Sequence, residues 1–263
     1  MTASFVVVAQ WQGSGSSRAM RLVDGADAIR GDLPTASTRV VEIPLEAGDS
    51  QGSGVHRLSA VSMVRDSFAE VLAQSDSPVI TVGGDCGVEL AAVAHAASDE
   101  MAVIWLDAHP DLNTPETSPS GAFAGMVLRT LLGDGAAGLV PTTALTPTRV
   151  VLAGVRSIDP GEAQYIAEQS IAMVRASEVS AATLIDAVEA TGATSVYVHI
   201  DLDVLDPGDI PRRLACSPTT LWPLSRPSSS VSPSSEPESR SSLRDRPRTP
   251  STTSRRFCGS SGR

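Results

Sequence analysis

Patterns of buried strands and amphipathic helices alternate along about the first 210 residues. Short runs rich in Val and Ile, without polar alternation, predict strands that are buried on both faces. The predicted strands are Phe5–Ala9, Arg39–Ile43, Val79–Val82, Val103–Leu106, Arg149–Ala153, Ile171–Val174 and Ser195–Ile200. The segments between them predict helices at Ser17–Arg30, Val55–Ser75, Val88–Ser98, Phe123–Leu132, Gly161–Gln169 and Ala181–Thr191. This alternation predicts an α/β fold, with a mostly parallel sheet and helices on both faces.

The pattern stops abruptly near Pro211. Residues 212–263 contain 15 Ser and 7 Pro, with scattered Arg and almost no apolar periodicity. Such a segment cannot bury enough apolar surface to offset its ordering entropy, so we expect disorder. A natural flexible tail and a shifted reading frame in a GC-rich coding sequence both explain it. The break directly after a site motif favours the second. We therefore expect a folded domain over residues 1–211 and a tail over residues 212–263.

Charge is divided unevenly between these two parts. The chain has a net charge of −10 and no lysine. Residues 1–211 hold 10 Arg against 27 acidic residues, whereas residues 212–263 hold 10 Arg against 3. A basic tail is a feature of arms that bind nucleic acid. A shifted frame explains the same composition, so we do not expect a nucleic-acid partner.

The composition indicates a globular protein without membrane segments. Hydrophobic residues make up 41% of the chain, which is typical of globular proteins. No run of 18 apolar residues occurs, so no transmembrane helix is expected. Residues 1–10 lack the basic region of a secretory signal. Cys86, Cys216 and Cys258 have no regular spacing and suggest no disulfide framework. We therefore expect a cytoplasmic protein.

Three acidic clusters each follow a predicted buried strand. They are Gly83-Gly84-Asp85-Cys86-Gly87, Asp107-Ala108-His109-Pro110-Asp111, and Asp201-Leu202-Asp203 with Asp206-Pro207 after it. Ligands of parallel sheets bind beyond the carboxyl ends of the strands, so we expect all three loops at one edge. Each cluster alone is often only a tight turn or a helix cap. Their occurrence together, each after a strand, indicates a site.

The residue types in these clusters suit a divalent metal. Alternate residues of extended backbone point the same way, so Asp107, His109 and Asp111 are expected to face one point, as are Asp201 and Asp203. These ligands would repel one another unless cations neutralised them. Oxygen ligands with an imidazole suit Mn²⁺ or another divalent first-row ion. Two such ions a few Å apart can share a bridging carboxylate.

The three motifs in this order resemble the signature motifs of the ureohydrolase family, which includes arginases, agmatinases and formimidoylglutamases. The resemblance covers about residues 1–211. It implies a three-layer α/β/α sandwich, usually assembled as trimers or hexamers, with Mn²⁺ as the usual cofactor. It also implies that Asp107 and Asp201 bridge two metals, that His109 and Asp203 bind the second, and that Asp111 binds the first.

This resemblance implies a hydrolase of C–N bonds in linear guanidino or amidino compounds, which releases urea from a guanidino substrate. In the implied mechanism a metal-activated hydroxide attacks the guanidinium carbon. Asp107 and Asp201 would stabilise the tetrahedral intermediate, and Asp111 would hold the hydroxide and accept its proton afterwards. The small-molecule substrate itself is left open among arginine, agmatine, guanidinobutyrate, formimidoylglutamate and related compounds.

Four further residues match family positions that contact the substrate. Asn113 and Ser120 correspond to residues that hold the amino-acid end of arginase substrates. Asp159 and Glu162 resemble a loop that contacts the α-amino group. For Asp159 and Glu162, a helix N-terminal cap with an acidic first turn is an equally good interpretation. Asn113 and Asp159 favour an amino-acid substrate.

Cys86 departs from the family pattern, because it stands where the family has a His ligand of the first metal. A thiolate is a soft ligand, whereas Mn²⁺ prefers hard ones. Three interpretations therefore stay open for Cys86: a ligand of another ion such as Zn²⁺ or Fe²⁺, a weak ligand, or a buried thiol. The second-metal ligands are complete, so a site with one metal is also plausible.

Other departures concern proton transfer and substrate binding. Ala124 replaces a His that carries protons in arginases, a task that alanine cannot perform. Ala122 replaces a substrate-binding Asn. His199 is not at a family ligand position. Strand alternation places it on the same face as Asp201, so one interpretation is a residue that supports the metal ligands without binding the metal. The favoured interpretation is a core histidine with its hydrogen bonds satisfied.

The tail lacks further family features. No motif after Pro211 matches the family Glu that binds the guanidinium group. The strand and helices that complete the family sheet are also missing. Their absence would expose an apolar edge of the sheet. We therefore expect weak or no activity. The alternative is a catalytically degenerate homologue that still binds metal. A nucleotide-binding protein is disfavoured, because Asp85 in the Gly-Gly-Asp loop would repel phosphate.

Overall fold

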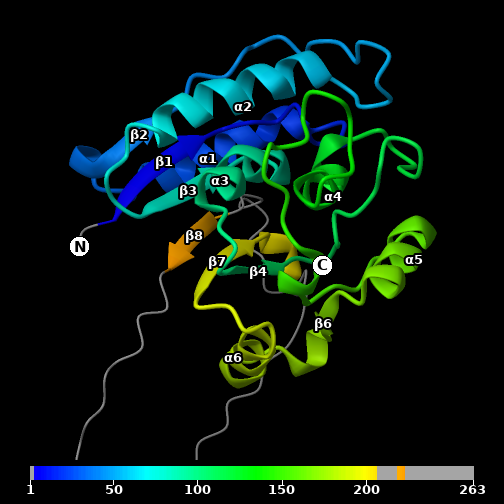
Figure 1. Cartoon of the computed structure of the whole chain (residues 1–263). Coiled ribbons are helices and arrows are strands. Elements are labelled where there is room, and N and C mark those ends of the chain that lie inside the picture. Colours follow the sequence, from blue (N-terminus) through cyan, green and yellow to red (C-terminus); the bar gives the residue numbers. More distant parts are fainter. Residues whose placement is uncertain (1–2, 206–217, 223–263) are drawn as a thin grey trace, which may run out of the picture. The chain divides into compact units, whose positions relative to one another are not determined.

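The computed structural model describes residues 3–205 and 218–222, which contain one eight-stranded sheet with the strand order β2-β1-β3-β8-β7-β4-β5-β6 (Figure 1). All of its pairings are parallel except those of β8, which runs antiparallel to β3 and β7. The mostly parallel sheet predicted from the sequence is confirmed. The strands are β1 (Ser4–Val8), β2 (Thr38–Val40), β3 (Val79–Gly83), β4 (Met101–Leu106), β5 (Val150–Ala153), β6 (Ala172–Val174), β7 (Ser195–Ile200) and β8 (Pro218–Trp222).

Helices cover both faces of this sheet. Because alternate residues of a strand point to opposite faces, Val103 and Trp105 of β4 join the core under α2, α3 and α4, whereas Ala102 and Ile104 join the core under α6. Figure 1 shows α2 and α6 on opposite sides of the strands. The helices are α1 (Leu22–Arg30), α2 (Leu58–Leu72), α3 (Glu89–Ala96), α4 (Val127–Leu131), α5 (Pro160–Gln169) and α6 (Ala181–Ala190). None of the helices in the described part of the chain is long and apolar enough to cross a membrane.

The strand β8 is an element that the sequence pattern does not predict. Residues 218–222 lie in the segment for which no regular structure is expected, yet they pair with both β3 and β7. Their Thr and Trp residues favour extended backbone, and the two neighbouring strands supply hydrogen-bond partners on both sides. These five residues thus lie between β3 and β7 in the sheet, and no open edge is left there. The rest of the predicted tail, 212–217 and 223–263, lies outside the described residues.

The register of the sheet brings the second and third acidic clusters together. Leu106 at the end of β4 pairs with Ile200 at the end of β7. The next residues, Asp107 and Asp201, therefore begin neighbouring loops, and the Asp201 N–H donates to the Leu106 carbonyl at 2.8 Å. Since β3 runs parallel to β1 in the same sheet, its end delivers Cys86 to the same edge.

Candidate metal centre

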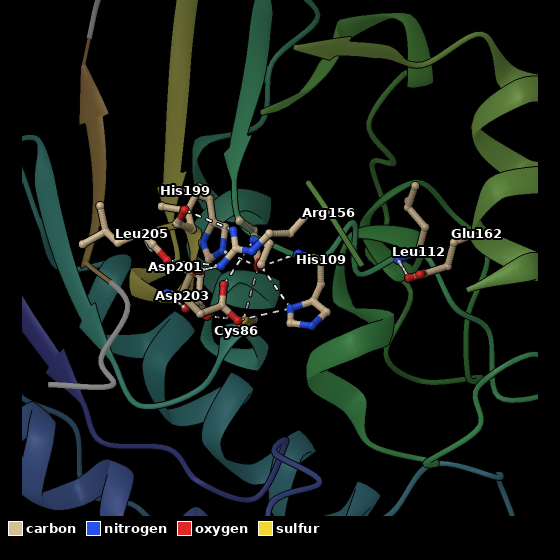
Figure 2. A network of polar contacts seen from close by, with 12 residues as sticks. Cys86, His109, Leu112, Arg156, Glu162, His199, Asp201, Asp203 and Leu205 are labelled. Carbon is tan, nitrogen blue, oxygen red and sulfur yellow. Dashed lines mark hydrogen bonds and ion pairs between the residues drawn. The ribbon is translucent and has the colours of Figure 1, made fainter. Parts of the chain in front are cut away.

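Four side chains in or just after the strands β3, β4 and β7 form a compact group of potential metal ligands. Cys86, Asp107, His199 and Asp201 each offer one donor atom, and these atoms all lie within 4.8 Å of one another (Figure 2). The Cys86 Sγ is 3.1 Å from Asp201 Oδ2 and 3.9 Å from Asp107 Oδ2. His199 Nε2 is 3.6 Å from the same Asp107 oxygen. The group lies inside the protein, since all but the half-buried Asp201 are buried.

A second group shares Asp107 with the first. His109 Nδ1 lies 3.4 Å from Asp107 Oδ1 and 3.2 Å from Asp203 Oδ2. The His109 side chain is 51% exposed and that of Asp203 43% exposed, so this group opens to solvent. Asp107 presents Oδ2 to the first group and Oδ1 to the second. That geometry suits two adjacent cations bridged by one carboxylate.

Asp111 lines the same cavity as both groups, although it is not a member of either. Its backbone is left-handed, with φ of 52°, rather than extended as the sequence analysis assumes. The carboxylate is buried, and its Oδ2 has no hydrogen-bond partner. Burial, and then the charge of Asp107, raise the pKa of Asp111 well above its usual value. An unpartnered buried carboxylate is unfavourable unless a cation or proton neutralises it, so Asp111 fits a site built for cations.

The pKa shifts of the residues in the two groups also indicate a cation site. Burial acts to raise the pKa of Asp107, but the neighbouring imidazoles of His109 and His199 outweigh it and hold that pKa below its usual range. Hydrogen bonds to Asp107 and Asp203 raise the pKa of His109 to about 11. Burial acts to lower the pKa of His199, but its contacts with Asp107 and Glu89 raise it to about 10. Burial and the charge of Asp107 raise the pKa of Asp201. This negatively charged set of oxygen, nitrogen and sulfur donors therefore suits a divalent cation.

The Gly-Gly-Asp turn fixes Cys86 at the edge of the sheet. The Asp85 carboxylate accepts hydrogen bonds from Gln10 Nε2 and from the backbone N–H groups of Gly13 and Gly87, each at 2.8 Å. Burial raises the pKa of Asp85 to about 6, although these hydrogen bonds act to lower it. A Cβ atom at Gly84 would lie 1.9 Å from the Gln10 carbonyl oxygen, so only glycine fits there. Asp85 thus ties the loop after β1 to the turn that carries Cys86.

Arg156 holds the loop that carries the third acidic cluster. Its guanidinium donates to the carbonyl oxygens of Val204 at 3.1 Å and Leu205 at 3.2 Å, and also to that of Asp203 (Figure 2). The Asp203 Oδ1 accepts a hydrogen bond from the Ala108 N–H at 3.1 Å. The second and third clusters are therefore held together by the protein itself.

His199 has a set of buried partners that the sequence analysis does not anticipate. Its Nδ1 lies 3.0 Å from Glu89 Oε1, and the Tyr197 hydroxyl donates to Glu89 Oε2 at 2.5 Å. The Trp105 ring stacks on the imidazole, with ring centroids 3.8 Å apart. The favoured interpretation of His199 as a satisfied core residue is therefore incomplete, because Nδ1 is paired whereas Nε2 faces Asp107 without a hydrogen bond. Glu89 lies on α3 and Tyr197 on β7, so only the tertiary fold reveals the network.

A cavity of about 410 Å³ runs from the ligand residues to the predicted substrate residues Asn113, Ser120, Asp159 and Glu162. Asn113 Nδ2 donates to Asp159 Oδ2 at 2.9 Å. Glu162 accepts hydrogen bonds from the backbone N–H of Asp159 at 2.8 Å and of Leu112 at 2.9 Å. Both oxygens of Glu162 are thus engaged at the start of α5, as the helix-cap interpretation expects. The Ser120 Oγ accepts from the Ala122 N–H at 3.2 Å. The substrate contacts of these four residues stay predictions.

Comparison with known proteins places these features in a family context. The model of the "Arginase family" matches residues 15–212. An arginase of Bacillus caldovelox is 34% identical over 197 residues, covering 69% of this chain and 64% of the relative. An arginase of Bacillus subtilis is 37% identical over 153 residues, covering 54% and 51%. An N(omega)-hydroxy-L-arginine amidinohydrolase of Streptomyces lavendulae is 31% identical over 209 residues, covering 77% and 71%. The chain thus spans about half to two thirds of the length of these relatives.

Solved structures of arginases share the fold. The native Bacillus caldovelox arginase matches with a TM-score of 0.64 at 29% identity, covering 80% of this chain and 78% of the other. The Entamoeba histolytica arginase in complex with L-ornithine matches with a TM-score of 0.69 at 24% identity, covering 79% and 78%. The predicted arginase-like three-layer fold is therefore confirmed.

Proposed function

The chain belongs to the arginase family, and on that premise we propose that its site hydrolyses a C–N bond of a linear guanidino compound and releases urea. The supporting observation is the position of Asp107, whose two carboxylate oxygens face two separate ligand groups at one end of the cavity. A shared carboxylate between two ligand groups is an arrangement used in hydrolysis by paired metal ions.

The residues of the two groups would hold the cations. Asp107, Asp201 and Cys86 surround one site, with Asp111 beside it, and Asp107, His109 and Asp203 surround the other. When bound, such cations supply Lewis acidity that makes water acidic near neutral pH. Mn²⁺ is the ion expected from the family resemblance. Burial and the nearby carboxylates raise the pKa of the Cys86 thiol, so a cation that binds its sulfur would have to displace the proton. A sulfur ligand would favour Zn²⁺ or Fe²⁺ on its side of the centre.

The chain supplies the proton chemistry through Asp111. Its buried Oδ2 is free of hydrogen bonds within the protein and lies on the cavity wall, where it can accept the proton of the attacking water. Ala124, on the wall of the same cavity, offers no group to carry the proton onward. We therefore propose a turnover rate below the value of about 10 s⁻¹ that is typical of enzymes.

The far side of the cavity favours a substrate with an amino-acid end. The Asp159 carboxylate and the Asn113 amide lie 2.9 Å apart on the cavity wall and offer an anionic acceptor beside an amide. An α-ammonium group is a suitable partner for such a pair. We propose α-amino acids with a terminal guanidino or N-hydroxyguanidino group. The name of the Streptomyces lavendulae relative, N(omega)-hydroxy-L-arginine amidinohydrolase, is consistent with this class.

The test is release of urea, or of hydroxyurea from N-hydroxy-L-arginine, by the full chain after loading with Mn²⁺, Zn²⁺ or Fe²⁺. The substrates are L-arginine, N-hydroxy-L-arginine, agmatine and guanidinobutyrate. We expect release from the two amino acids and a loss of at least about 100-fold in Asp111→Asn, which is typical when a proton acceptor is removed. Asp134→Asn is the matched control, because Asp134 is exposed and forms an ion pair with Arg129.

A non-catalytic metal-binding protein is the second candidate function. The absence of a proton carrier at Ala124 favours it. Bound metal without release of urea or hydroxyurea from any of the four substrates would support this second function and contradict the first.

We also propose two further properties: a homo-oligomer, as a trimer or hexamer, which the family resemblance supports, and a cytoplasmic location. Light scattering of the purified chain tests the first. A monomer at micromolar concentration would contradict it.

A further inference from the structure

We propose that His199 is a direct metal ligand, which supplies the imidazole of the cation site that Cys86 lines, and that Glu89 orients it. This inference rests on the metal centre of the proposed function. It differs from the family pattern, in which the residue at position 86 supplies this imidazole and the position of His199 supplies no ligand.

The two imidazole nitrogens of His199 have different surroundings, and this difference supports the proposal. His199 is fully buried, and its Nδ1 lies 3.0 Å from Glu89 Oε1. Its Nε2 has no hydrogen-bond partner. Nε2 is 3.6 Å from Asp107 Oδ2, which is too long for a hydrogen bond. A buried ring nitrogen that lacks a hydrogen bond and lies among three other potential ligands is placed to bind a cation.

The spacing of the donor atoms fits one cation. Metal–ligand distances of about 2.0–2.3 Å put the ligand atoms of a tetrahedral site about 3.3–3.8 Å apart. The separations here are 3.1 Å for Cys86 Sγ to Asp201 Oδ2, 3.9 Å for Cys86 Sγ to Asp107 Oδ2, and 3.6 Å for His199 Nε2 to Asp107 Oδ2. These three separations are close to that range, and all four donor atoms lie within 4.8 Å of one another, so they surround a common centre.

The partners of His199 match those of metal-binding histidines. Such residues usually donate their other ring N–H to a carboxylate, which fixes the tautomer and the ring orientation. Glu89 fills this role at Nδ1, and Tyr197 donates to the other Glu89 oxygen at 2.5 Å. The stacked Trp105 ring holds the plane of the imidazole. Nδ1 is thereby kept protonated, and Nε2 is left to bind the cation.

The resulting donor set has a chemical consequence. One sulfur, one nitrogen and two carboxylates form a softer site than the oxygen-rich set that Mn²⁺ prefers. We therefore infer that the Cys86–His199 site selects Zn²⁺ or Co²⁺, whereas the His109 site accepts harder ions. Each site then has one imidazole, His199 in the first and His109 in the second.

The test is ¹⁵N nuclear magnetic resonance of the full chain with labelled histidine, recorded before and after addition of Zn²⁺. The chain has four histidines, His56, His95, His109 and His199. We expect the imidazole nitrogen signals of His109 and His199 to move to metal-bound positions, and those of His56 and His95 to stay unchanged. This readout does not depend on enzymatic activity or on the folding of a variant.

A variant supports the assignment of the signals. In His199→Asn the amide can keep the hydrogen bond to Glu89, while the donor at the Nε2 position is removed. We expect the affinity of one Co²⁺ site to fall by more than about 100-fold, beyond the 10–100-fold typical of a residue that only positions a ligand. The thiolate-to-Co²⁺ absorption of Cys86 should weaken with it. His95→Asn is the control, and circular dichroism checks the fold.

The possible results separate this inference from the proposed function. Two metal-bound imidazoles, His109 and His199, support it. A change at His109 alone, with the His199 signal unmoved, would overturn the inference and leave the proposed metal centre standing. If no imidazole signal moved, both the inference and the proposed centre would be wrong.

Discussion

Glu89 and His199 form a fully buried pair, with Oε1 of the first 3.0 Å from Nδ1 of the second. The carboxylate comes from α3 and the imidazole from β7, so the pair ties a helix to the centre of the sheet. Tyr197, two residues before His199 on the same strand, donates to the other Glu89 oxygen. A buried charge is stable only with such partners. They hold the Glu89 carboxylate next to His199, on the side away from the other candidate metal ligands.

Removal of the Glu89 charge should weaken metal binding without abolishing it. In Glu89→Gln the side chain keeps its size, but the imidazole loses its anionic partner. We expect the affinity for Zn²⁺ to fall about 10–100-fold, as is usual for partners of metal-binding histidines. Competition with a coloured chelator measures it. Tyr197→Phe, which removes one hydrogen bond to the same carboxylate, should have a smaller effect, and an unchanged affinity in Glu89→Gln would contradict this role.

The identity of residue 86 should set the preferred metal. In Cys86→His the soft thiolate is replaced by an imidazole, which suits Mn²⁺ better. We expect the preference for Zn²⁺ over Mn²⁺ to fall by at least about tenfold, as measured by competition between the two ions. Cys86→Ser is the matched control, since it removes the sulfur without adding a nitrogen ligand. Equal preferences in wild type and Cys86→His would show that the Cys86 side chain does not bind the ion.

Loss of the Arg156 clamp should loosen the loop that carries Asp203. Arg156→Met keeps much of the aliphatic chain but removes the donors to the carbonyl groups of residues 203–205. We expect weaker metal binding by about tenfold, an effect of the size found for residues around metal ligands. Isothermal titration calorimetry measures it. Arg175→Met is the control, because Arg175 forms an exposed ion pair with Glu178. Both residues are distant in sequence from the candidate metal ligands. The clamp would be unimportant if both variants bound metal equally.

The buried carboxyl of Glu162 should give the stability a distinct dependence on pH. Burial raises the pKa of Glu162 above its usual value of 4.5, although the N–H groups of Asp159 and Leu112 act to lower it. The folded chain then holds more protons than the unfolded chain between these two pKa values. The contribution of this group to the free energy of unfolding therefore falls as pH rises through that window.

Glu162→Gln removes this titration and isolates its effect. We expect the free energy of unfolding of wild type, relative to that of the variant, to decrease as the pH rises above the usual pKa of 4.5. Denaturant titrations in the presence of a chelator measure it. Glu168→Gln is the control, because Glu168 lies on the same helix and is exposed. A relative stability that increased with pH would contradict the raised pKa.

The sequence pattern predicts much of the fold because buried parallel strands have a strong local signature. The strand predicted at 195–200 has the bounds of β7, and the helix predicted at 181–191 differs from α6 by one residue. The strand β8 is different. It depends on hydrogen bonds with β3 and β7, which are distant in sequence. The local sequence has no periodicity that predicts such a strand.

The candidate site, like the fold, is only partly predictable from the sequence. The Asp107, His109, Asp201 and Asp203 side chains follow directly from strand ends, and their meeting is predictable from the parallel order of the strands. The role of His199 is not predictable in this way. Its Glu89 partner is 110 residues away and comes from the packing of α3 on β7. Local sequence cannot show which nitrogen of a buried histidine is left without a partner.

The number of metal ions bound by each chain tests the central claim most directly. The full chain would be dialysed to equilibrium against Zn²⁺ and analysed for zinc and protein. Two ions per wild-type chain, and one in His199→Asn, are predicted from the two ligand groups that share Asp107. One ion or none in the wild type would contradict the account of a two-metal centre.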